Sequence, residues 1–265
     1  MSCVRIEKAD PAIAILTMER QAKLNAYDDG LIDGLTAVCL ELQDDTRVKA
    51  VIITGGLRVF SAGADVSLFD SIECEPDVNK VRRMLQKGKR MIDLWENLPM
   101  PTIAAVEGGA VGGGFTLALA CDWRVFAEDA WAMIPEVKIG LNYGWGTLPR
   151  LAALAGPARA KWMSILCRRH GAAELAQWNI AEEVSAKGQA LDAALDIARE
   201  ISRLPMLAPQ LIKRSVNAHS FALAKSSSIG DMEDMLVCMT DPEGAEMRRQ
   251  AVSKIRSSAS KVAHQ

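Results

Sequence analysis

The chain of 265 residues is poor in aromatic side chains and nearly neutral, with two tyrosines and a formal net charge of −2 at pH 7. So few rings argue against a surface on which single-stranded bases stack. A charge this close to zero provides no general attraction to nucleic acids or anionic membranes. We therefore expect neither a nucleic-acid nor a membrane partner. An anionic ligand would have to be bound by local charges or by backbone amides.

Paired cysteines and long apolar runs are also absent. The six cysteines include no CxxC pair and lie in apolar contexts, which favours free thiols in a reducing compartment over disulfides or a zinc site. The first residues lack the apolar core of a signal peptide, and charged residues interrupt every apolar run before it reaches membrane-spanning length. These features predict a cytoplasmic protein without a metal site.

Strand-like and helix-like segments alternate along the first two thirds of the chain. Short apolar or β-branched runs predict strands at Ala12–Met18, Lys49–Thr54, Thr102–Val106 and Trp123–Ala127. Apolar residues at helical spacing predict helices at Gly30–Leu42, Val81–Leu98 and Phe115–Cys121. This alternation is typical of the α/β class. From about Pro157 the sequence is Ala-rich and helical, with no clear strand signal and no flexible linker before it.

Two of the predicted strands lead through a loop of small residues into a helix. The first loop is Ser61–Asp65 and the second is Gly112–Gly114. Small residues allow a ligand to approach the backbone, and the first amides of a helix lack intrahelical partners. One amide from each loop could converge on a single oxygen and form an oxyanion hole.

Two other interpretations of these loops stay open at this level. The glycines could serve only tight turns and close helix–strand packing, which is the better interpretation for either loop alone. A phosphate-binding loop is the other alternative, but the Lys-Ser/Thr ending of a P-loop is missing, and the pattern does not match a dinucleotide-binding fingerprint.

Glu136 is the candidate acid/base. It follows Pro135 in an apolar segment that includes Met133, Ile134 and Val137. Burial there would raise its pKa toward the range useful for proton transfer. The alternative is a surface glutamate paired with a neighbouring lysine.

Taken together, these segments resemble the crotonase superfamily, also called the enoyl-CoA hydratase/isomerase family. The matching segments keep their order and spacing over residues 20 to 150: Lys23-Leu-Asn-Ala26, Phe60-Ser-Ala-Gly-Ala-Asp65, Pro101–Val106, Gly112–Gly114, Ala120-Cys-Asp122, Pro135-Glu136 and Gly140-Leu141. Each segment is weak evidence alone, whereas the ordered set is specific.

The resemblance implies an acyl-coenzyme A thioester as substrate, with coenzyme A part of that substrate and no separate cofactor. Backbone amides of Ala64 and Gly113 would hold the thioester oxygen, and Glu136 would transfer protons. Ala62 would meet the adenine end, and Ala22 and Leu24 would line the pantetheine path. The matching segments supply the other substrate-binding positions: Asp65, Val66, Pro135 and Leu141.

The resemblance also implies the architecture. We expect a crotonase-like β/α spiral core over residues 1–200. A C-terminal helical region over residues 201–265 would help to form a homotrimer, often paired into a hexamer.

One position departs from the family's hydratases. The resemblance implies that members which add water efficiently carry two catalytic glutamates. One would be at the position of Glu136, and the other would lie three residues after the position of Gly113. Thr116 stands there in this chain, and it is the fourth catalytic candidate beside Glu136, Ala64 and Gly113. A threonine can position a water or a hydroxyl, but it cannot act as a carboxylate base.

One carboxylate and an oxyanion hole suffice for a 1,3-proton shift in a 3-enoyl thioester. They also suffice for hydration of an activated, for example aromatic, enoyl thioester. A thioesterase, decarboxylase or retro-aldol lyase could use the same oxyanion hole. A catalytically weak binding or scaffold protein is the alternative from another class.

Several other residues are expected to be structural. Asp65 is expected to cap a helix, Asp122 to support a strand, and Trp145 to serve packing. Tyr143 is expected to pack near a turn, with contact to an acyl group as the less favoured alternative. Lys213 is expected on a solvated face, with coenzyme A phosphates as a less favoured partner.

Overall fold

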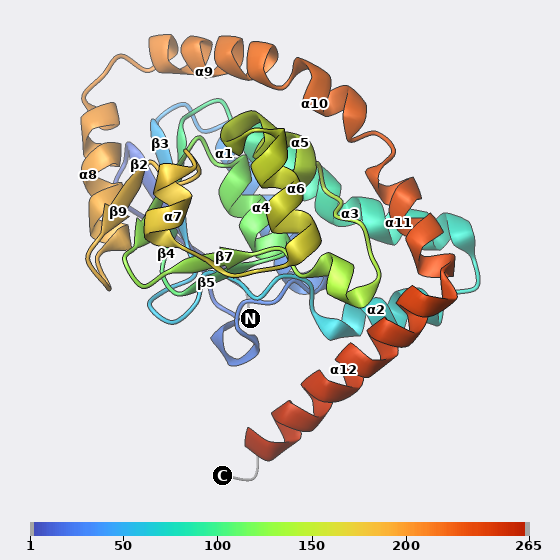
Figure 1. The fold of residues 1–265 in the computed structure, drawn as a ribbon. Helices are drawn as coiled ribbons and strands as arrows, with labels where there is room; N and C mark the ends of the chain where they lie inside the picture. The colour runs from blue at the N-terminus through green and yellow to red at the C-terminus, as the bar shows by residue number, and fades with distance from the viewer. Residues whose placement is uncertain (1–2, 263–265) are drawn as a thin grey trace.

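The main sheet has six strands in the order β1-β2-β3-β4-β6-β9 (Figure 1). The computed structural model describes residues 3–262, and the side chains of residues 9, 66, 69, 73, 224, 225 and 255–262 lie outside that description. β1 runs antiparallel to β2, and every other neighbouring pair is parallel. The strands are β1 (Val4–Asp10), β2 (Ile13–Met18), β3 (Ala50–Thr54), β4 (Thr102–Val106), β6 (Trp123–Ala127) and β9 (Glu183–Ser185).

The central strands are covered on both faces. Every residue of β3 and β4 is buried, as expected for parallel strands between helical layers. Helix α8 (Ala190–Ser202) packs against β3, β4 and β6, and α4 (Gly113–Ala120) contacts β4 from the other side (Figure 1). The predicted α/β class is therefore confirmed.

A second, three-stranded sheet was not predicted. It contains β5 (Gly109–Val111), β7 (Trp131–Met133) and β8 (His170–Gly171) in that order. The expectation of no strand after Pro157 is wrong, because β8 and β9 lie in that region. Strands of two or three residues are too short to show alternation, and their pairing partners are distant in sequence.

The helices of the first half lie close to their predicted positions. Their bounds are α1 (Asp29–Gln43), α2 (Val66–Glu73) and α3 (Val78–Glu96). Helix α3 begins three residues earlier than the apolar pattern indicated, because the Asp77 side chain caps it by accepting a hydrogen bond from the Asn79 amide (2.8 Å). Helix α4 begins at Gly113 rather than Phe115, so the Gly113 amide lies in its first turn.

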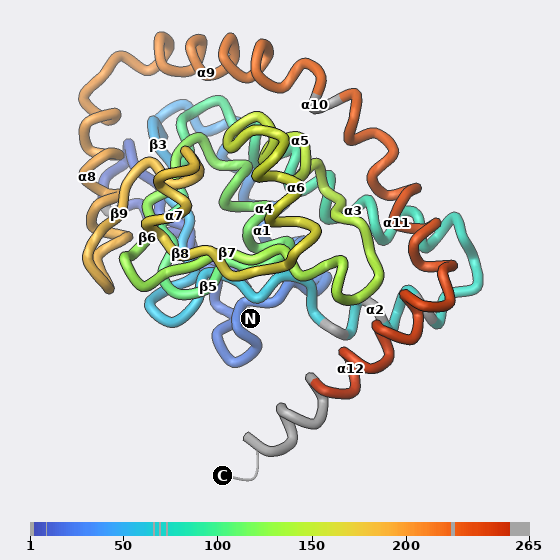
Figure 2. The backbone as a smooth tube through the Cα atoms, in the orientation of Figure 1, coloured from blue at the N-terminus to red at the C-terminus, as the bar shows by residue number. Residues whose placement is uncertain are grey.

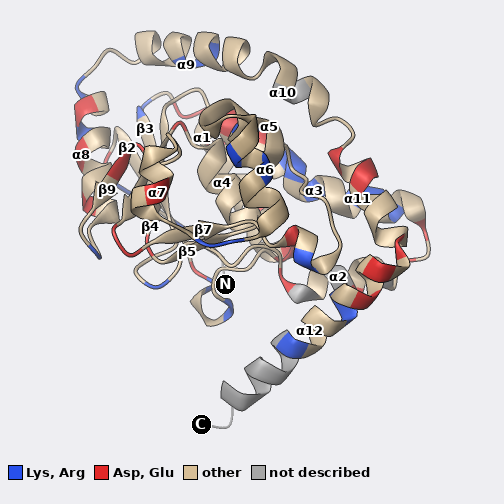
Figure 3. Cartoon of the chain, in the orientation of Figure 1, with Lys and Arg blue, Asp and Glu red and all other residues tan. Residues whose placement is uncertain are grey.

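The later helices surround the core. They are α5 (Thr147–Ala155), α6 (Pro157–Leu166), α7 (Ala172–Gln177), α9 (Leu207–Ser220), α10 (Ala222–Ser227), α11 (Asp231–Thr240) and α12 (Pro242–Val262). From α9 onward the chain passes around the outside of the core until α11 contacts α3 (Figure 2). Acidic and basic side chains are mixed on α8 and α12, whereas the charged side chains of α11 are all acidic (Figure 3). Within residues 3–262, no helix is long and apolar enough to cross a bilayer.

Lys213 differs from its expected role on a solvated face. It is 9% exposed, and its Nζ atom lies 2.7 Å from Asp122 Oδ2 and donates to the Met100 carbonyl (3.0 Å). Asp122 also accepts hydrogen bonds from the amide and hydroxyl of Thr102. The structural role expected for Asp122 is thus confirmed, and the ion pair attaches α9 to the ends of β4 and β6.

Candidate active site

Asn25 organises the first loop. Its buried side chain donates to the carbonyls of Gly55 (3.0 Å) and Phe60 (3.1 Å), and its backbone carbonyl accepts from the Ser61 hydroxyl (2.8 Å). Leu24 and Asn25 both have left-handed backbone angles, with φ of 52° and 51°. These bonds hold residues 24–26 against the loop that follows β3.

The Ala64 amide takes no part in the backbone hydrogen bonds that join its neighbours to Tyr27. Tyr27 and Ala64 form an isolated parallel bridge, in which the Tyr27 amide donates to the Gly63 carbonyl and the Asp65 amide donates to the Tyr27 carbonyl. In that geometry the flanking residues pair with Tyr27, and the N–H of Ala64 points away from it. Ala64 lines the cavity that Glu136 also lines, where such a donor can meet a ligand.

The second loop brings Gly113 close to the first. Gly113 is the first residue of α4, so its N–H has no partner within the helix. A Cβ atom at Gly63 would lie 3.4 Å from the Gly113 nitrogen and 2.7 Å from the Val111 carbonyl oxygen. The close approach of the two loops therefore requires glycine at 63, and Ala64 and Gly113 line the same cavity.

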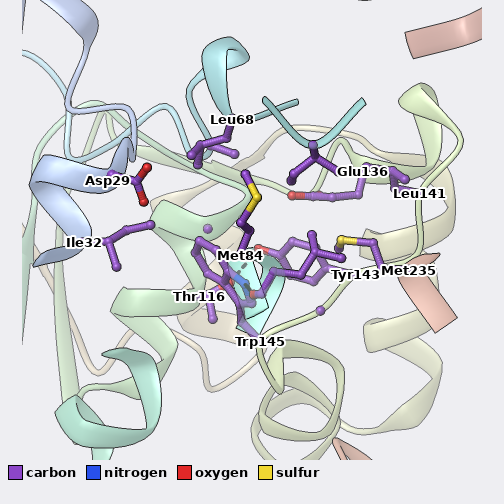
Figure 4. Close-up of a pocket in the computed structure, with 15 residues that line it drawn as sticks. Asp29, Ile32, Leu68, Met84, Thr116, Glu136, Leu141, Tyr143, Trp145 and Met235 are labelled. Atoms are coloured by element: carbon purple, nitrogen blue, oxygen red, sulfur yellow. Dashed lines mark hydrogen bonds between the residues drawn. The ribbon is translucent and has the colours of Figure 1, made fainter. Parts of the chain in front are cut away.

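This cavity is narrow and mostly apolar. Its volume is about 90 Å³. Figure 4 shows the residues that line it: Asp29, Ile32, Ala64, Leu68, Ile72, Met84, Leu85, Gly113, Thr116, Glu136, Leu141, Tyr143, Gly144, Trp145 and Met235. Helices α1, α2, α3, α4 and α11 contribute to its walls, so the site combines elements from across the chain.

Glu136 reaches the cavity from a short 3₁₀ helix, Glu136–Ile139, which Pro135 precedes. Its Oε2 atom is buried and has no hydrogen-bond partner in the protein. Burial raises the pKa of Glu136 from 4.5 to about 8. A carboxyl group with this pKa can both remove and return a proton near neutral pH.

Asp29 is the other carboxylate of the cavity wall, and it lies on the opposite side from Glu136 (Figure 4). Its side chain is 68% exposed, and Lys87 Nζ lies 2.7 Å from its Oδ1 atom. An exposed, paired carboxylate is poorly suited to proton transfer in the interior. Glu136 is therefore the acid/base candidate that the cavity provides.

Thr116 is buried and belongs to a chain of hydroxyl groups. Its Oγ1 atom lies 2.9 Å from the Tyr143 hydroxyl and 2.7 Å from Thr147 Oγ1. Thr147 donates in turn to the Gly144 carbonyl (2.9 Å). Because a carbonyl can only accept, the Thr147 proton is directed at Gly144. The single Thr116 proton is then shared between Thr147 (2.7 Å) and the Gly112 carbonyl (3.4 Å), so Thr116 accepts from Tyr143. Thr116 is thus engaged with protein groups on both sides.

The remaining predicted binding residues fall into two groups. Leu24 and Ala62 lie together, since the Ala62 amide donates to the Leu24 carbonyl (2.9 Å), and Ala22 is exposed beside them. Leu141 lines the cavity and Pro135 precedes the Glu136 helix.

Asp65 has partners within the protein. Its carboxylate caps α2 by accepting from the Ser67 amide (3.0 Å) and pairs with Arg20 (2.8 Å). This is the capping role expected for it, and Asp65 does not line the cavity. Val66 begins α2, and its side chain is outside the described part of the structure.

Several cavity residues were not identified from the sequence as site residues. Trp145 was expected to serve packing, and contact with an acyl group was the less favoured alternative for Tyr143. Met84 and Met235 lie in segments expected to line the acyl pocket, residues 66–90 and the helical tail, but neither was named individually. The two methionines come from α3 and α11, which are far apart in sequence. In the part of the chain that the structure describes, no group of three or more His, Cys, Asp or Glu side chains could hold a metal.

Comparison with a family model identifies the family to which this chain belongs. The model described as "Enoyl-CoA hydratase/isomerase" matches residues 8–252. The chain belongs to the enoyl-CoA hydratase/isomerase family. The resemblance drawn from the ordered motifs is therefore confirmed, and the protein is an enzyme of this hydratase/isomerase family.

Individual relatives agree with this assignment. The chain is 32% identical over 206 residues to the short-chain-enoyl-CoA hydratase of Clostridium acetobutylicum, covering 77% of each. It is also 34% identical over 162 residues to the fatty acid oxidation complex subunit alpha of Idiomarina loihiensis, but spans only 22% of that protein's length. Among solved structures, an enoyl-CoA hydratase/isomerase from Xanthobacter autotrophicus Py2 is 28% identical, with a TM-score of 0.85 over 99% of this chain and 96% of that one.

Proposed function

We propose that this enoyl-CoA hydratase/isomerase family member isomerises 3-enoyl-CoA thioesters, using Glu136 as a single acid/base. The supporting observation is the buried, unpartnered Oε2 atom of Glu136 in an apolar cavity. The amides of Ala64 and Gly113 bind the thioester oxygen. Leu24 and Ala62 flank the coenzyme A path, and residues 201–265 contribute to a trimer or a pair of trimers.

The reaction needs one carboxylate. Glu136 removes a proton from carbon 2 of the thioester. The electron pair of that C–H bond forms a carbon 1–carbon 2 double bond while the carbonyl π pair moves onto the thioester oxygen. The resulting dienolate keeps its carbon 3–carbon 4 double bond and carries its negative charge on the oxygen that Ala64 and Gly113 hold. When Glu136 returns the proton, the carbonyl re-forms, the carbon 1–carbon 2 pair becomes the carbon 2–carbon 3 double bond, and the carbon 3–carbon 4 π pair binds the proton at carbon 4. Removing one oxyanion donor typically costs about 3 kcal/mol of barrier, so both amides matter.

The hydroxyl chain favours isomerisation over hydration. In a two-glutamate hydratase the second carboxylate would help to activate water. Here Thr116 donates to Thr147 and accepts from Tyr143. It has no proton left to give, and it is not basic enough to activate a water. The second candidate, hydration of an activated enoyl thioester, would need the substrate itself to polarise its double bond.

A panel of 3-enoyl, 2-enoyl and hydroxycinnamoyl thioesters tests the proposal when products are identified by mass. We expect 3-enoyl thioesters to be converted to conjugated isomers, and Glu136→Gln to reduce the rate by about 10²- to 10⁴-fold. Glu41→Gln, on the exposed surface of α1, is the matched control. Full turnover by Glu136→Gln would disprove the mechanism. Release of free coenzyme A, CO₂ or an aldehyde would support the cleavage alternatives instead.

A further inference from the structure

Helix α3 carries a glycine in its interior that contacts the active site. Gly88 is buried in the middle of a 19-residue helix, where glycine is less favourable than alanine. A Cβ atom at this position would overlap the six-membered ring of Trp145. The absence of a side chain at 88 therefore allows the indole to lie directly against the α3 backbone.

The backbone around Trp145 fixes this orientation. Trp145 and Gly146 are consecutive left-handed residues, with φ of 59° and 71°. The Trp145 Nε1–H donates to the Leu85 carbonyl (3.3 Å), and the Gly146 amide donates to Asp231 Oδ2 (2.8 Å). Contacts with α3 on one side and α11 on the other thus hold the indole in place.

A second cavity lies on the other side of this turn. We call it the rear chamber, and its volume is about 260 Å³. The residues that line the rear chamber are Lys89, Asp93, Glu96, Asn97, Gly146, Arg150, Phe221 and Ser228. Its charges are paired internally, because Arg150 contacts Glu96 (2.7 Å) and Lys89 contacts Asp93 (2.7 Å).

Trp145 lies between the two cavities along α3. Met84 and Leu85 line the catalytic cavity, Gly88 meets the indole, and Lys89 and Asp93 line the rear chamber on the following turns. The catalytic cavity of about 90 Å³ is small beside the roughly 300–1,000 Å³ of sites for larger ligands. The indole thus forms the wall of the catalytic cavity on the side of the rear chamber.

The indole is also close to the reacting end of the substrate. A Cβ atom at Gly113 would lie 2.6 Å from the Trp145 ring, so the ring packs against the residue that supplies one oxyanion donor. Figure 4 shows Trp145 beside Thr116, across the cavity from Leu68. An acyl chain held by its thioester oxygen would meet the indole after only a few carbon atoms.

We propose that Trp145, seated on Gly88, is the residue that determines acyl-chain length, and that it restricts this enzyme to short, apolar acyl thioesters. The proposal rests on the proposed function for the direction in which the acyl group enters. Trp145 acts by excluding longer chains, and it takes no part in proton transfer.

The test measures binding rather than turnover. Calorimetric affinities are compared for saturated acyl-CoA thioesters from butanoyl to dodecanoyl. In the wild type we expect affinity to rise about fourfold for each added methylene, the gain from burying one CH₂ group, and to stop rising at a short chain length. Trp145→Ala should move this limit to longer chains. Gly88→Ala should move it to shorter chains, because the new methyl group pushes the indole into the cavity.

Control variants separate this effect from general damage. Trp162→Ala removes an indole that is 47% exposed on α6 and stacks with Arg168, and it should leave the chain-length limit unchanged. The double variant Gly88→Ala/Trp145→Ala should regain the long-chain limit, because no ring remains for the methyl group to displace. If Trp145→Ala does not fold, Trp145→Phe and Gly88→Ala provide the same comparison with smaller shifts in opposite directions.

The two proposals fail in different ways. Identical chain-length limits in folded wild type, Trp145→Ala and Gly88→Ala would overturn the assignment of Trp145, whatever reaction the enzyme catalyses. A shifted limit without isomerisation of any 3-enoyl thioester would support the role of Trp145 and contradict the proposed reaction.

Discussion

The hydroxyl oxygens of Thr116 and Tyr143 lie 2.9 Å apart in the wall of the cavity that contains Glu136. Thr116 occupies the position at which the resemblance to the family's efficient hydratases would place a second glutamate. Burial and the nearby Glu136 carboxylate raise the pKa of Tyr143 well above its usual value, so this hydroxyl stays protonated. The pair is therefore neutral and bonded internally, and Glu136 is left as the titrating group.

Replacing Thr116 by valine should affect stability more than chemistry. The variant leaves the buried Tyr143 hydroxyl without its acceptor, while Thr147 keeps its bond to the Gly144 carbonyl, and a buried group without a partner costs about 1–3 kcal/mol. Urea denaturation measures the loss of stability, and the isomerisation rate should stay within about threefold of wild type because no proton passes through Thr116. A 100-fold slower rate in a variant of normal stability would instead place Thr116 in the proton path.

The rate of isomerisation should depend on the protonation of Glu136. The free enzyme needs the carboxylate form to remove the carbon 2 proton, and burial raises the pKa of Glu136 to about 8. We therefore expect kcat/KM to increase about tenfold per pH unit below that pKa and to level off above it. A value of kcat/KM that stays constant between about pH 6 and 9 would show that Glu136 is not the base.

The same pKa shift predicts how stability depends on pH. Between pH 4.5 and about 8, the folded protein retains a proton on Glu136 that the unfolded chain has lost. The stability that the protonated Glu136 side chain contributes to the folded protein is fully present below pH 4.5, and it is lost as the pH rises through about 8. Glutamine does not titrate, so the stability of Glu136→Gln relative to wild type should increase by at most ~1.4 kcal/mol per pH unit across that window. Thermal unfolding at several pH values measures this, and a constant difference would contradict it.

Much of the fold is predictable because it follows from local patterns. The strands β2, β3, β4 and β6 have apolar or β-branched runs that are recognisable in isolation. The two small-residue loops are also recognisable locally, because their glycines, alanines and serine follow directly after predicted strands. Their convergence depends on tertiary contacts, such as the bonds from Asn25 to Gly55 and Phe60, which no local pattern reveals.

The individual residues of the acyl wall could not be predicted in the same way, although the segments that contain many of them, residues 66–90 and the helical tail, could be. Met84 and Met235 belong to different helices, and their apolar character is explained equally well by ordinary packing. One local signal did exist, because Gly88 interrupts an otherwise strongly amphipathic helix. Its meaning emerges only when Trp145 is seen to occupy the space where a side chain would be.

The attachment of α11 to the active-site turn provides a further prediction. Asp231 is 8% exposed, and it accepts the hydrogen bond of the buried Gly146 amide. Asp231→Ala should lower the free energy of unfolding by about 1–3 kcal/mol, because it leaves that amide without its acceptor. Asp231→Asn keeps an acceptor oxygen and should lose less than half as much. Equal losses in urea denaturation would show that the carboxylate charge, rather than the hydrogen bond, is what matters.

The most direct test of the single-carboxylate account is the conversion of a 3-enoyl thioester in D₂O, followed by mass spectrometry. The account predicts migration of the double bond with uptake of deuterium and without the mass of an added water, and it predicts that Glu136→Gln abolishes both changes. A product that carries added water, or migration that persists in Glu136→Gln, would contradict it.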